Sequence, residues 1–396
     1  MENATSGFNA TPQASRLHIA LFGRRNVGKS SLFNALAGQP AAIVADHAGT
    51  TTDPVRRAIE LHPLGPCLLI DTAGYDEADD EIGRRRLQAT LDVAATADVA
   101  LLVTDTAPQT IDLEWLNRLR AMELPVLVVY NKGYQPEHPL QPSVAVDVIT
   151  EATTRLLREA VISLAPQGDV TPSLTAGLAA PGDVVLLVMP QDRQAPRGRL
   201  ILPQVQTIRD LLDRECTVVG CTPARLEATL AALAAPPKLM ITDSQVFDFV
   251  AARCPEGCRL TSFSVLMAAA KGDIGYLADG ARHIDRLTPA SRVLIAEACT
   301  HAPLTEDIGR EKLPRILRAR VGQSLEVEIR SGKDWPADLS GYDLIIHCGA
   351  CMFNRRQMLS RIARAREQSV AMTNYGLAIA HLKGILPRVS LPNTAN

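Results

Sequence analysis

Short apolar runs alternate with longer amphipathic stretches along most of this chain. Apolar runs of about four to six residues are typical of strands that are buried on both faces. The stretches between them carry apolar residues at helical spacing, and strands that alternate with helices indicate an α/β fold with parallel sheets. The predicted strands are residues 17–22, 67–70, 126–130, 184–188, 217–219, 238–242, 292–296 and 342–346.

The first predicted strand leads directly into a phosphate-binding loop. The loop is Gly23–Ser30, and a helical pattern begins at Ser31. In such a loop backbone N–H groups and the helix N-terminus face phosphate oxygens, the lysine reaches the outer phosphates, and the last hydroxyl ligates magnesium. Strand, loop and helix are all present, so we expect this region to bind a nucleotide. The residues expected to contact it here are Gly23, Arg24, Arg25, Asn26, Val27, Gly28, Lys29, Ser30 and Ser31.

Two further segments complete the nucleotide site. The second predicted strand ends in Asp71-Thr72-Ala73-Gly74, which suits an acid near magnesium and a glycine whose N–H meets the terminal phosphate. Residues 49–53 form a polar segment that can fold over the nucleotide. Together with the loop, these segments resemble the switch GTPases, in particular the branch of Era and the tRNA-modification GTPases.

This resemblance implies roles for individual residues. Thr51 is the expected switch threonine, although Thr50 and Thr52 fit the same role, and magnesium is expected on Ser30, Thr51 and Asp71. The catalytic set is then Lys29, Thr51, Asp71 and Gly74. Asn26 resembles the asparagine that helps to hold potassium against the phosphates; the alternative is an asparagine chosen for turn geometry.

The base-recognition segment departs from that family. Asn131-Lys132-Gly133-Tyr134 follows the strand at 126–130, and the family motif has an aspartate where Tyr134 stands. A phenol cannot accept two hydrogen bonds from the guanine edge, and each bond to the missing charge is worth about 1.5–3 kcal/mol. We still expect Asn131 and Lys132 in the nucleotide site, with a weakened or relaxed preference for guanine.

Near the other end of the chain, cysteine and histidine gather in two short segments. Cys299-Thr300-His301 follows the strand at 292–296, and His347-Cys348-Gly349-Ala350-Cys351 follows the run at 342–346. The carboxyl ends of parallel strands meet at one crevice, so the two segments can form one site. Three thiolates fit a 4Fe-4S cluster whose fourth position is left to a histidine, water or another molecule. They fit a three-Cys, one-His zinc site equally well.

Composition narrows the setting of these sites. A net charge of −2 provides no basic field for nucleic acid, and 4% aromatic residues leave few platforms for stacking bases. The first 16 residues lack the apolar core of a signal peptide, and no run approaches the roughly 20 apolar residues of a membrane span. We therefore expect a cytoplasmic protein with reduced thiols and no disulfide. Cys67, Cys216 and Cys221 are predicted core or near-surface thiols, and Cys254 and Cys258 predicted loop residues.

The 396 residues have room for two or three domains of about 100–200 residues each. A stretch rich in Pro, Gly, Ser and Thr at 166–181 predicts a linker. Residues 182–259 contain no catalytic constellation, so we expect a packing or dimerisation role. The predicted organisation is a disordered tail at 1–16, a P-loop domain at 17–165, the linker, and two smaller α/β domains with parallel sheets at 182–259 and 260–396.

With these motifs assembled, the whole chain resembles the FeFe-hydrogenase maturation GTPases (HydF). The segments that carry this resemblance are residues 260–264, 296–301, 307–309, 347–352 and 373–376, together with the phosphate loop. The resemblance implies a GTPase domain of slow hydrolysis, a dimerisation domain at 182–259 and a cluster-binding domain at 260–396. Cys299, Cys348 and Cys351 would hold a 4Fe-4S cluster, with His301 or His347 as the fourth ligand.

The resemblance also implies a role as a carrier. The protein, as a homodimer, would accept a diiron precursor made by two radical-SAM maturases and pass it to apo-FeFe-hydrogenase, with GTP, Mg²⁺ and K⁺ serving the switch. Arg355 and Arg356 are candidates for holding the anionic precursor, although a solvated helix start explains them equally. Two alternatives stay open: a cluster scaffold with impaired or relaxed nucleotide specificity, and a regulatory or RNA-assembly GTPase with a zinc-stabilised C-terminal domain.

Overall fold

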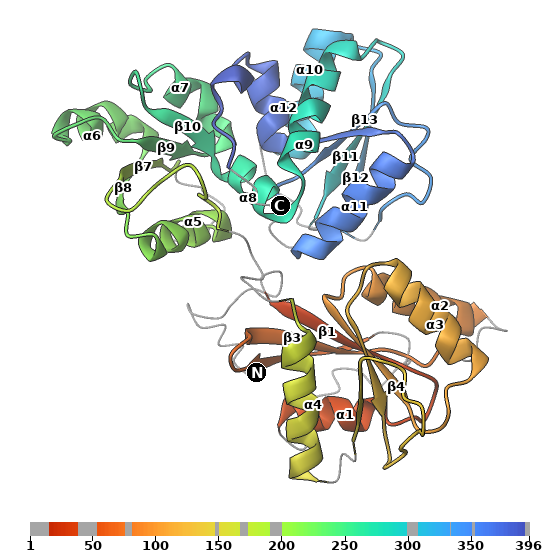
Figure 1. Cartoon of the computed structure of the whole chain (residues 1–396). Helices are drawn as coiled ribbons and strands as arrows, with labels where there is room; N and C mark the ends of the chain where they lie inside the picture. Colours follow the sequence, from red (N-terminus) through yellow and green to blue (C-terminus); the bar gives the residue numbers. More distant parts are fainter. Residues whose placement is uncertain are drawn as a thin grey trace, which may run out of the picture. The chain divides into compact units, whose positions relative to one another are not determined.

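The chain divides into two units, residues 1–170 and 171–396 (Figure 1). The computed structural model describes residues 16–38, 54–75, 81–146, 150–166, 173–190, 200–298, 308–332, 334–350 and 353–392. Four predicted site residues, Thr51, Cys299, His301 and Cys351, lie outside these ranges, as does nearly all of the predicted tail. Among the described helices, none combines the length and the apolar composition needed to cross a membrane.

The first unit is built on a six-stranded sheet in the order β2-β3-β1-β4-β5-β6. All neighbours pair in parallel except β2, which runs antiparallel to β3. The strands are β1 (Leu17–Phe22), β2 (Val55–Leu61), β3 (Gly65–Asp71), β4 (Val99–Thr104), β5 (Val126–Tyr130) and β6 (Ser143–Ala145). The helices are α1 (Lys29–Ala37), α2 (Glu81–Ala94), α3 (Thr110–Ala121) and α4 (Glu151–Leu164).

Alternation along the central strands feeds two apolar cores, one on each face of this sheet. In β1, Ile19 and Leu21 join the core under α1 and α4, whereas Ala20 and Phe22 join the core under α2 and α3. Successive side chains of a strand point to opposite faces, which is why a continuous apolar run serves both cores. The predicted α/β fold of this P-loop domain is confirmed.

The second unit holds two four-stranded parallel sheets, in the orders β10-β9-β7-β8 and β12-β11-β13-β14. Each places its first strand beside its second on one side and its third on the other, so the two sheets share one topology. The strands are β7 (Val184–Val188), β8 (Thr217–Cys221), β9 (Leu239–Thr242), β10 (Arg259–Ser262), β11 (Arg292–Glu297), β12 (Glu326–Ser331), β13 (Leu344–His347) and β14 (Ala371–Asn374).

Helices cover and connect these two sheets. They are α5 (Leu202–Asp213), α6 (Leu226–Ala232), α7 (Phe247–Ala251), α8 (Phe263–Lys271), α9 (Ile274–Arg282), α10 (Leu313–Val321), α11 (Arg355–Glu367) and α12 (Tyr375–Leu382). Shorter helical turns are at Pro223–Arg225, Ser244–Val246, His283–Arg286, Ile308–Lys312 and Leu386–Arg388. One apolar core contains residues of both sheets, so the sheets form a single unit.

The two sheets meet where α8 and α12 begin. Ser262 and Asn374 cap these helices, each accepting a hydrogen bond from the backbone N–H three residues on. Ser264 Oγ in turn accepts hydrogen bonds from Gly376 N and from Asn374 Nδ2, both at 3.2 Å. α8 is buried almost along its whole length because the two sheets enclose it.

The structure differs from two of the predicted domain boundaries in this unit. The predicted domain boundary between residues 259 and 260 would cut through β10, which pairs with β9 in the first of the two sheets. The strand β10 therefore belongs with the residues before it. The later part of the predicted linker is packed: Leu174 and Leu178 are buried, and Thr175 donates to Asp210 on α5 (2.6 Å). Residues 173–181 therefore belong to the sheet that follows them, because their apolar side chains complete its core.

Helix α9 lies directly against the backbone of the edge strand β14. A Cβ added to Gly280 would lie 1.9 Å from Met372 O, so only glycine permits this approach of the helix to the strand. Tyr276, one turn earlier, donates from its hydroxyl to Val370 O (2.6 Å). This edge of the sheet is therefore covered by a helix.

Candidate functional site

The phosphate loop joins β1 to α1 as the sequence predicts. Gly28 stands at the N-cap of α1 with a φ of 95°, a conformation that favours glycine. A Cβ there would also lie 2.2 Å from Asn131 Nδ2, so the close approach of the two segments requires glycine. The N-terminus of α1 then opens toward the loop, which is the arrangement that binds phosphate.

The loop places an ammonium and a hydroxyl beside the end of β3. Lys29 is buried, and its Nζ donates to Gly23 O (2.9 Å) and Arg24 O (2.7 Å). Ser30 Oγ donates to Asp71 Oδ2 (2.6 Å). Asp71 is in place because β1 and β3 pair in parallel, with Leu21 opposite Asp71. The structure thus brings Lys29, Ser30 and Asp71 together, and Gly74 follows three residues later in the described segment.

Asp71 is suited to a magnesium ion. Burial raises the pKa of its carboxyl, while the hydrogen bond from Ser30 and the nearby Lys29 ammonium lower it. Its second oxygen, Oδ1, is buried and has no hydrogen-bond partner among the described residues. A hard cation takes such carboxylate and hydroxyl oxygens as ligands, so the donor set fits Mg²⁺.

Asn131 and Lys132 tie the end of β5 to the phosphate loop. Asn131 Nδ2 donates to Val27 O, and Lys132 Nζ donates to Asn26 O, both at 2.8 Å. Lys132 also pairs with Asp105 (2.6 Å). Asn26 has a φ of 63°, which an asparagine tolerates better than most residues. Turn geometry is therefore enough to explain an asparagine at this position, and potassium binding stays a prediction.

Tyr134 packs inward. Its ring lies 5.9 Å from that of Tyr130, centroid to centroid, and its side chain packs against the core under α2 and α3. The position where the related GTPases carry a carboxylate is therefore occupied by a half-buried aromatic ring.

Sequence reasoning missed a buried carboxylate beside the loop. Asp112 on α3 is 1% exposed and accepts hydrogen bonds from Arg24 Nε (3.1 Å) and from the Tyr75 hydroxyl (2.7 Å). Tyr75 directly follows Gly74 and stacks on Trp115 at 4.9 Å. Asp112 thus joins the phosphate loop to the segment after β3. Its sequence context, an acid in the first turn of a helix, is too common to have marked it.

The described half of the cysteine site lies at the carboxyl ends of β11 and β13, as predicted. Cys348 follows β13, and its sulfur accepts a hydrogen bond from Ala298 N, 3.0 Å away, at the end of β11. The Cys348 N–H donates to Ala296 O (2.9 Å). The two strand ends are thus neighbours, and a backbone N–H aimed at sulfur suits a thiolate.

His347 does not have a ring nitrogen open to a metal in this arrangement. It is fully buried; Nδ1 lies 2.9 Å from Cys348 O and Nε2 lies 2.8 Å from Arg361 Nη1. Burial and the Arg361 charge lower the pKa of His347 to about 3, so its ring is neutral, donating from Nδ1 and accepting at Nε2. This geometry counts against His347 as the fourth ligand, because both nitrogens already hold the fold.

Arg361 is a second feature that sequence reasoning missed. Its guanidinium lies 4.4 Å from the ring centres of both Trp335 and Phe353, and Nη2 donates to Gly332 O (2.8 Å). It comes from α11, whose start is capped by Asn354 and Gln357. The predicted candidate Arg355 opens that helix and is exposed.

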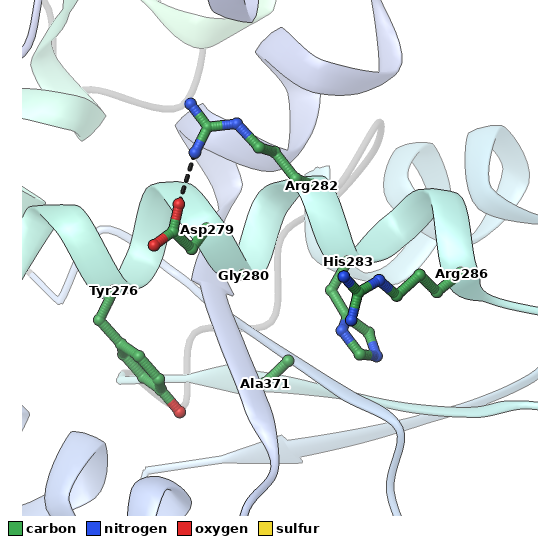
Figure 2. Close-up of a pocket in the computed structure, with 7 residues that line it drawn as sticks. All are labelled: Tyr276, Asp279, Gly280, Arg282, His283, Arg286 and Ala371. Carbon is green, nitrogen blue, oxygen red and sulfur yellow. Dashed lines mark hydrogen bonds and ion pairs between the residues drawn. The ribbon is translucent and has the colours of Figure 1, made fainter.

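The rest of the described chain offers a pocket but no further group of metal ligands. Within the described ranges, no three His, Cys, Asp or Glu residues form a group able to hold a metal ion. A pocket of about 250 Å³ lies between α9 and β14, and Figure 2 shows the residues that line it. Its wall includes Ala371, which pairs with Leu344 at the amino end of β13, so the pocket lies away from the strand ends that carry Cys348. Arg282 in this wall is already paired with Asp279 (2.5 Å).

Three family models match the chain. A model described as the hydrogen maturase F dimerization domain matches residues 174–272, and one described as the hydrogen maturase F tetramerization domain matches residues 275–392. A model described as a 50S ribosome-binding GTPase matches residues 18–132. The two hydrogen maturase F models together span more than half of the chain.

Curated relatives match part of the chain. The tRNA modification GTPase MnmE of Actinobacillus pleuropneumoniae is 42% identical over 121 residues, 29% of this chain and 26% of that protein. MnmE of Nitrosomonas europaea is 39% identical over 158 residues, 38% of this chain and 35% of that protein. The chain therefore matches only about a quarter to a third of the length of these curated relatives.

Solved structures give weaker matches. Aquifex aeolicus Era bound to GDP and aluminium fluoride has a TM-score of 0.32 and 20% identity, covering 55% of this chain and 98% of that one. The G domain of the Thermotoga maritima FeoB iron transporter has a TM-score of 0.31 and 23% identity, covering 38% and 98%. The assignment of the fold depends on strand order and on the family models.

Proposed function

Because the chain belongs to the HydF family, with a GTPase domain ahead of both hydrogen maturase F domains, we propose that it carries a 4Fe-4S cluster for hydrogenase maturation. The observation that supports this most is the Cys348 sulfur, which accepts a backbone N–H at the meeting point of β11 and β13. Cys299 and Cys351 are the proposed companion ligands. The described part of the site fits an iron-sulfur cluster in two respects: the Cys348 sulfur is a soft ligand, and the cationic Arg361 hydrogen-bonds His347, the residue before Cys348.

The cluster, when bound, supplies an iron with an exchangeable coordination position. We propose that a diiron precursor from two radical-SAM maturases docks there and passes to apo-FeFe-hydrogenase. The chain's own residues hold and orient this site: His347 fixes the Cys348 carbonyl, and Arg361 fixes His347. The fourth ligand is proposed to come from His301 or from outside the chain, since His347 uses both ring nitrogens.

Nucleotide binding is proposed to act as the switch. Lys29 would neutralise the outer phosphates, and Ser30, Asp71 and Thr51 would hold magnesium, so that hydrolysis releases the Thr51 segment. Potassium on Asn26 belongs to the same proposal. The dimerization and tetramerization models support self-association, and a homodimer is the proposed working form. A cytoplasmic location, which reduced thiols favour, stays a prediction.

One observation favours a second candidate, a scaffold whose nucleotide domain has relaxed specificity. Tyr134 is packed toward Tyr130 and offers the base no carboxylate. Steady-state hydrolysis with Mg²⁺ and K⁺ separates the two: a rate with GTP well above the rate with ATP supports the switch, whereas comparable rates with the two nucleotides, or a vanishing rate with both, favour the scaffold.

Anaerobic reconstitution of the full chain with iron and sulfide tests the proposed cargo site. We expect about four irons and four sulfides per chain, the paramagnetic signal of a reduced 4Fe-4S cluster, and transfer that activates apo-FeFe-hydrogenase when a diiron precursor is supplied. Stoichiometric zinc that iron and sulfide do not displace would overturn the proposal in favour of a structural zinc site.

A further inference from the structure

A buried lysine reaches the cysteine loop from the neighbouring sheet. Lys271 is the last residue of α8 and is 3% exposed. Its Nζ donates to Ala350 O (2.8 Å) and to Phe353 O (2.7 Å), residues 79 and 82 positions later. An ammonium is costly to bury, so contacts this specific indicate that the charge has a role at this place.

The two carbonyls that Lys271 binds stand on either side of residues 351 and 352. Ala350 has a φ of 52°, which costs a residue with a Cβ about 1 kcal/mol or more. Its carbonyl also accepts the Phe353 N–H (3.0 Å). Lys271 thus binds the carbonyls of two residues that lie two and five positions after Cys348, and the first of them, Ala350, has an otherwise unfavourable backbone conformation.

A second cation, Arg361, also contacts the segment around Cys348. Arg361 stacks on Phe353 and hydrogen-bonds His347, which precedes Cys348. Two largely buried positive charges therefore flank a segment of only seven residues, 347–353. Such a setting favours an anionic occupant, and a thiolate-ligated iron-sulfur cluster carries net negative charge.

Lys271 also comes from a different domain than the cysteine it supports. It lies within residues 174–272, matched by the dimerization model, whereas Cys348 lies within 275–392, matched by the tetramerization model. Ser264, on the same helix, bonds to the start of α12. α8 therefore connects the two domains through the hydrogen bond of Ser264 and through the charged side chain of Lys271.

We propose that Lys271 is a positioning residue for the cluster site: it fixes the loop that follows Cys348 and supplies a positive charge that favours the reduced cluster. The electrostatic part of this proposal rests on the proposed function. The positioning part does not, because the loop contacts are present in the chain itself.

Two substitutions separate donor from charge. Lys271→Gln keeps a hydrogen-bond donor and removes the charge, whereas Lys271→Met removes both at similar length. Lys383→Gln is the matched control, since Lys383 belongs to the same unit but pairs with Asp248 near the surface. Circular dichroism and a urea melt of each full-length variant establish that it is folded.

The first measurement is hydrogen exchange at the Phe353 amide of the metal-free protein. We expect exchange roughly tenfold faster in Lys271→Met and unchanged exchange in Lys383→Gln. Equal rates in the wild type and in Lys271→Met would overturn the positioning role, whatever metal the protein binds.

The second measurement is a redox titration of the reconstituted cluster, followed by its paramagnetic signal. Loss of a nearby positive charge disfavours the added electron, so Lys271→Gln should lower the reduction potential while Lys383→Gln leaves it in place. An unchanged potential in a Lys271→Gln protein with full iron content would overturn the electrostatic role. Failure of the wild type to take up iron and sulfide would instead overturn the proposed function, and hydrogen exchange would still decide the positioning role.

Discussion

The phosphate loop and the segment after Cys348 differ in what holds them in place. The phosphate loop is eight consecutive residues, Gly23–Ser30, whose shape follows largely from glycine conformation and a helix start, and distant side chains such as Asn131 and Asp112 then tie it to the rest of the sheet. The segment after Cys348 is held by Lys271, which lies 79 and 82 positions before the two carbonyls it binds and ends a helix next to another sheet. We therefore expect the segment after Cys348 to be the more sensitive of the two to substitutions at distant positions.

Cys348→Ser is expected to give the largest effect and to test whether the two sites are separable. A serine hydroxyl is a poor ligand for a soft metal, so iron-sulfur absorption should be abolished while nucleotide affinity stays unchanged. Iron analysis and nucleotide titration measure the two sites. Cys221→Ser, a half-buried thiol of β8, is the control. Loss of both activities in Cys348→Ser would show that the sites are coupled.

Lys29→Ala should do the reverse at the nucleotide site. Loss of its charge-assisted bonds to phosphate should weaken nucleotide binding roughly 100-fold or more and leave reconstituted iron unchanged. Isothermal titration with a non-hydrolysable GTP analogue measures the affinity. Lys238→Ala, at an exposed position of the second unit, should behave as the wild type. An affinity within threefold of the wild type would contradict the assigned site.

Tyr134→Asp tests whether the departure from the related GTPases decides base preference. The wild type should bind GTP and ATP with comparable dissociation constants. Restoring the carboxylate should raise the preference for GTP by roughly 10–100-fold, the value of one hydrogen bond to a charge. Competition titrations with both nucleotides measure the ratio. A strong preference for GTP in the unmodified protein would disprove relaxed specificity.

Asp112→Asn should weaken the tie between the phosphate loop and the segment after β3. The amide leaves the Arg24 charge without its buried carboxylate, so we expect the first unit to lose about 1–3 kcal/mol of stability. Urea denaturation followed by Trp115 fluorescence measures this loss. Glu81→Gln, which removes an exposed pair with Arg85, should cost less than about 0.5 kcal/mol. Equal losses in the two variants would contradict the role of Asp112.

Asp71→Asn should have the smallest and most conditional effect. Burial raises the pKa of Asp71 in the folded protein, so its charged form opposes folding. This cost is absent below the pKa of an exposed aspartate, grows as the pH rises from that pKa to the raised pKa of the folded protein, and is complete above the latter. Without Mg²⁺ the variant should be slightly more stable than the wild type at pH 7, which is well above the pKa of an exposed aspartate, and equal to it in acid. Urea melts at both pH values would refute this if the wild type were the more stable at pH 7.

Sequence reasoning reached the fold because buried strands are continuous apolar runs, and residues 17–22, 126–130 and 184–188 are strands as predicted. It also placed Cys348 at a strand end. It failed where side chains act over a distance. Nothing in the sequence separates Lys271 from an ordinary helix-ending lysine. His347 resembles a metal ligand in the sequence, but in the structure its two ring nitrogens contact Cys348 O and Arg361. Both roles depend on tertiary contacts, which a local sequence pattern does not encode.

The helix that lies on β14 also limits how copies of this domain can join. With Gly280 against the Met372 backbone, a strand from another molecule cannot add at that edge, and β12 forms the opposite edge of the same sheet. β12 carries Glu326, Glu328 and Arg330, all of them in ion pairs. A partner that joined along β12 would meet these charged side chains at the interface, so the strength of such an association would depend on ionic strength.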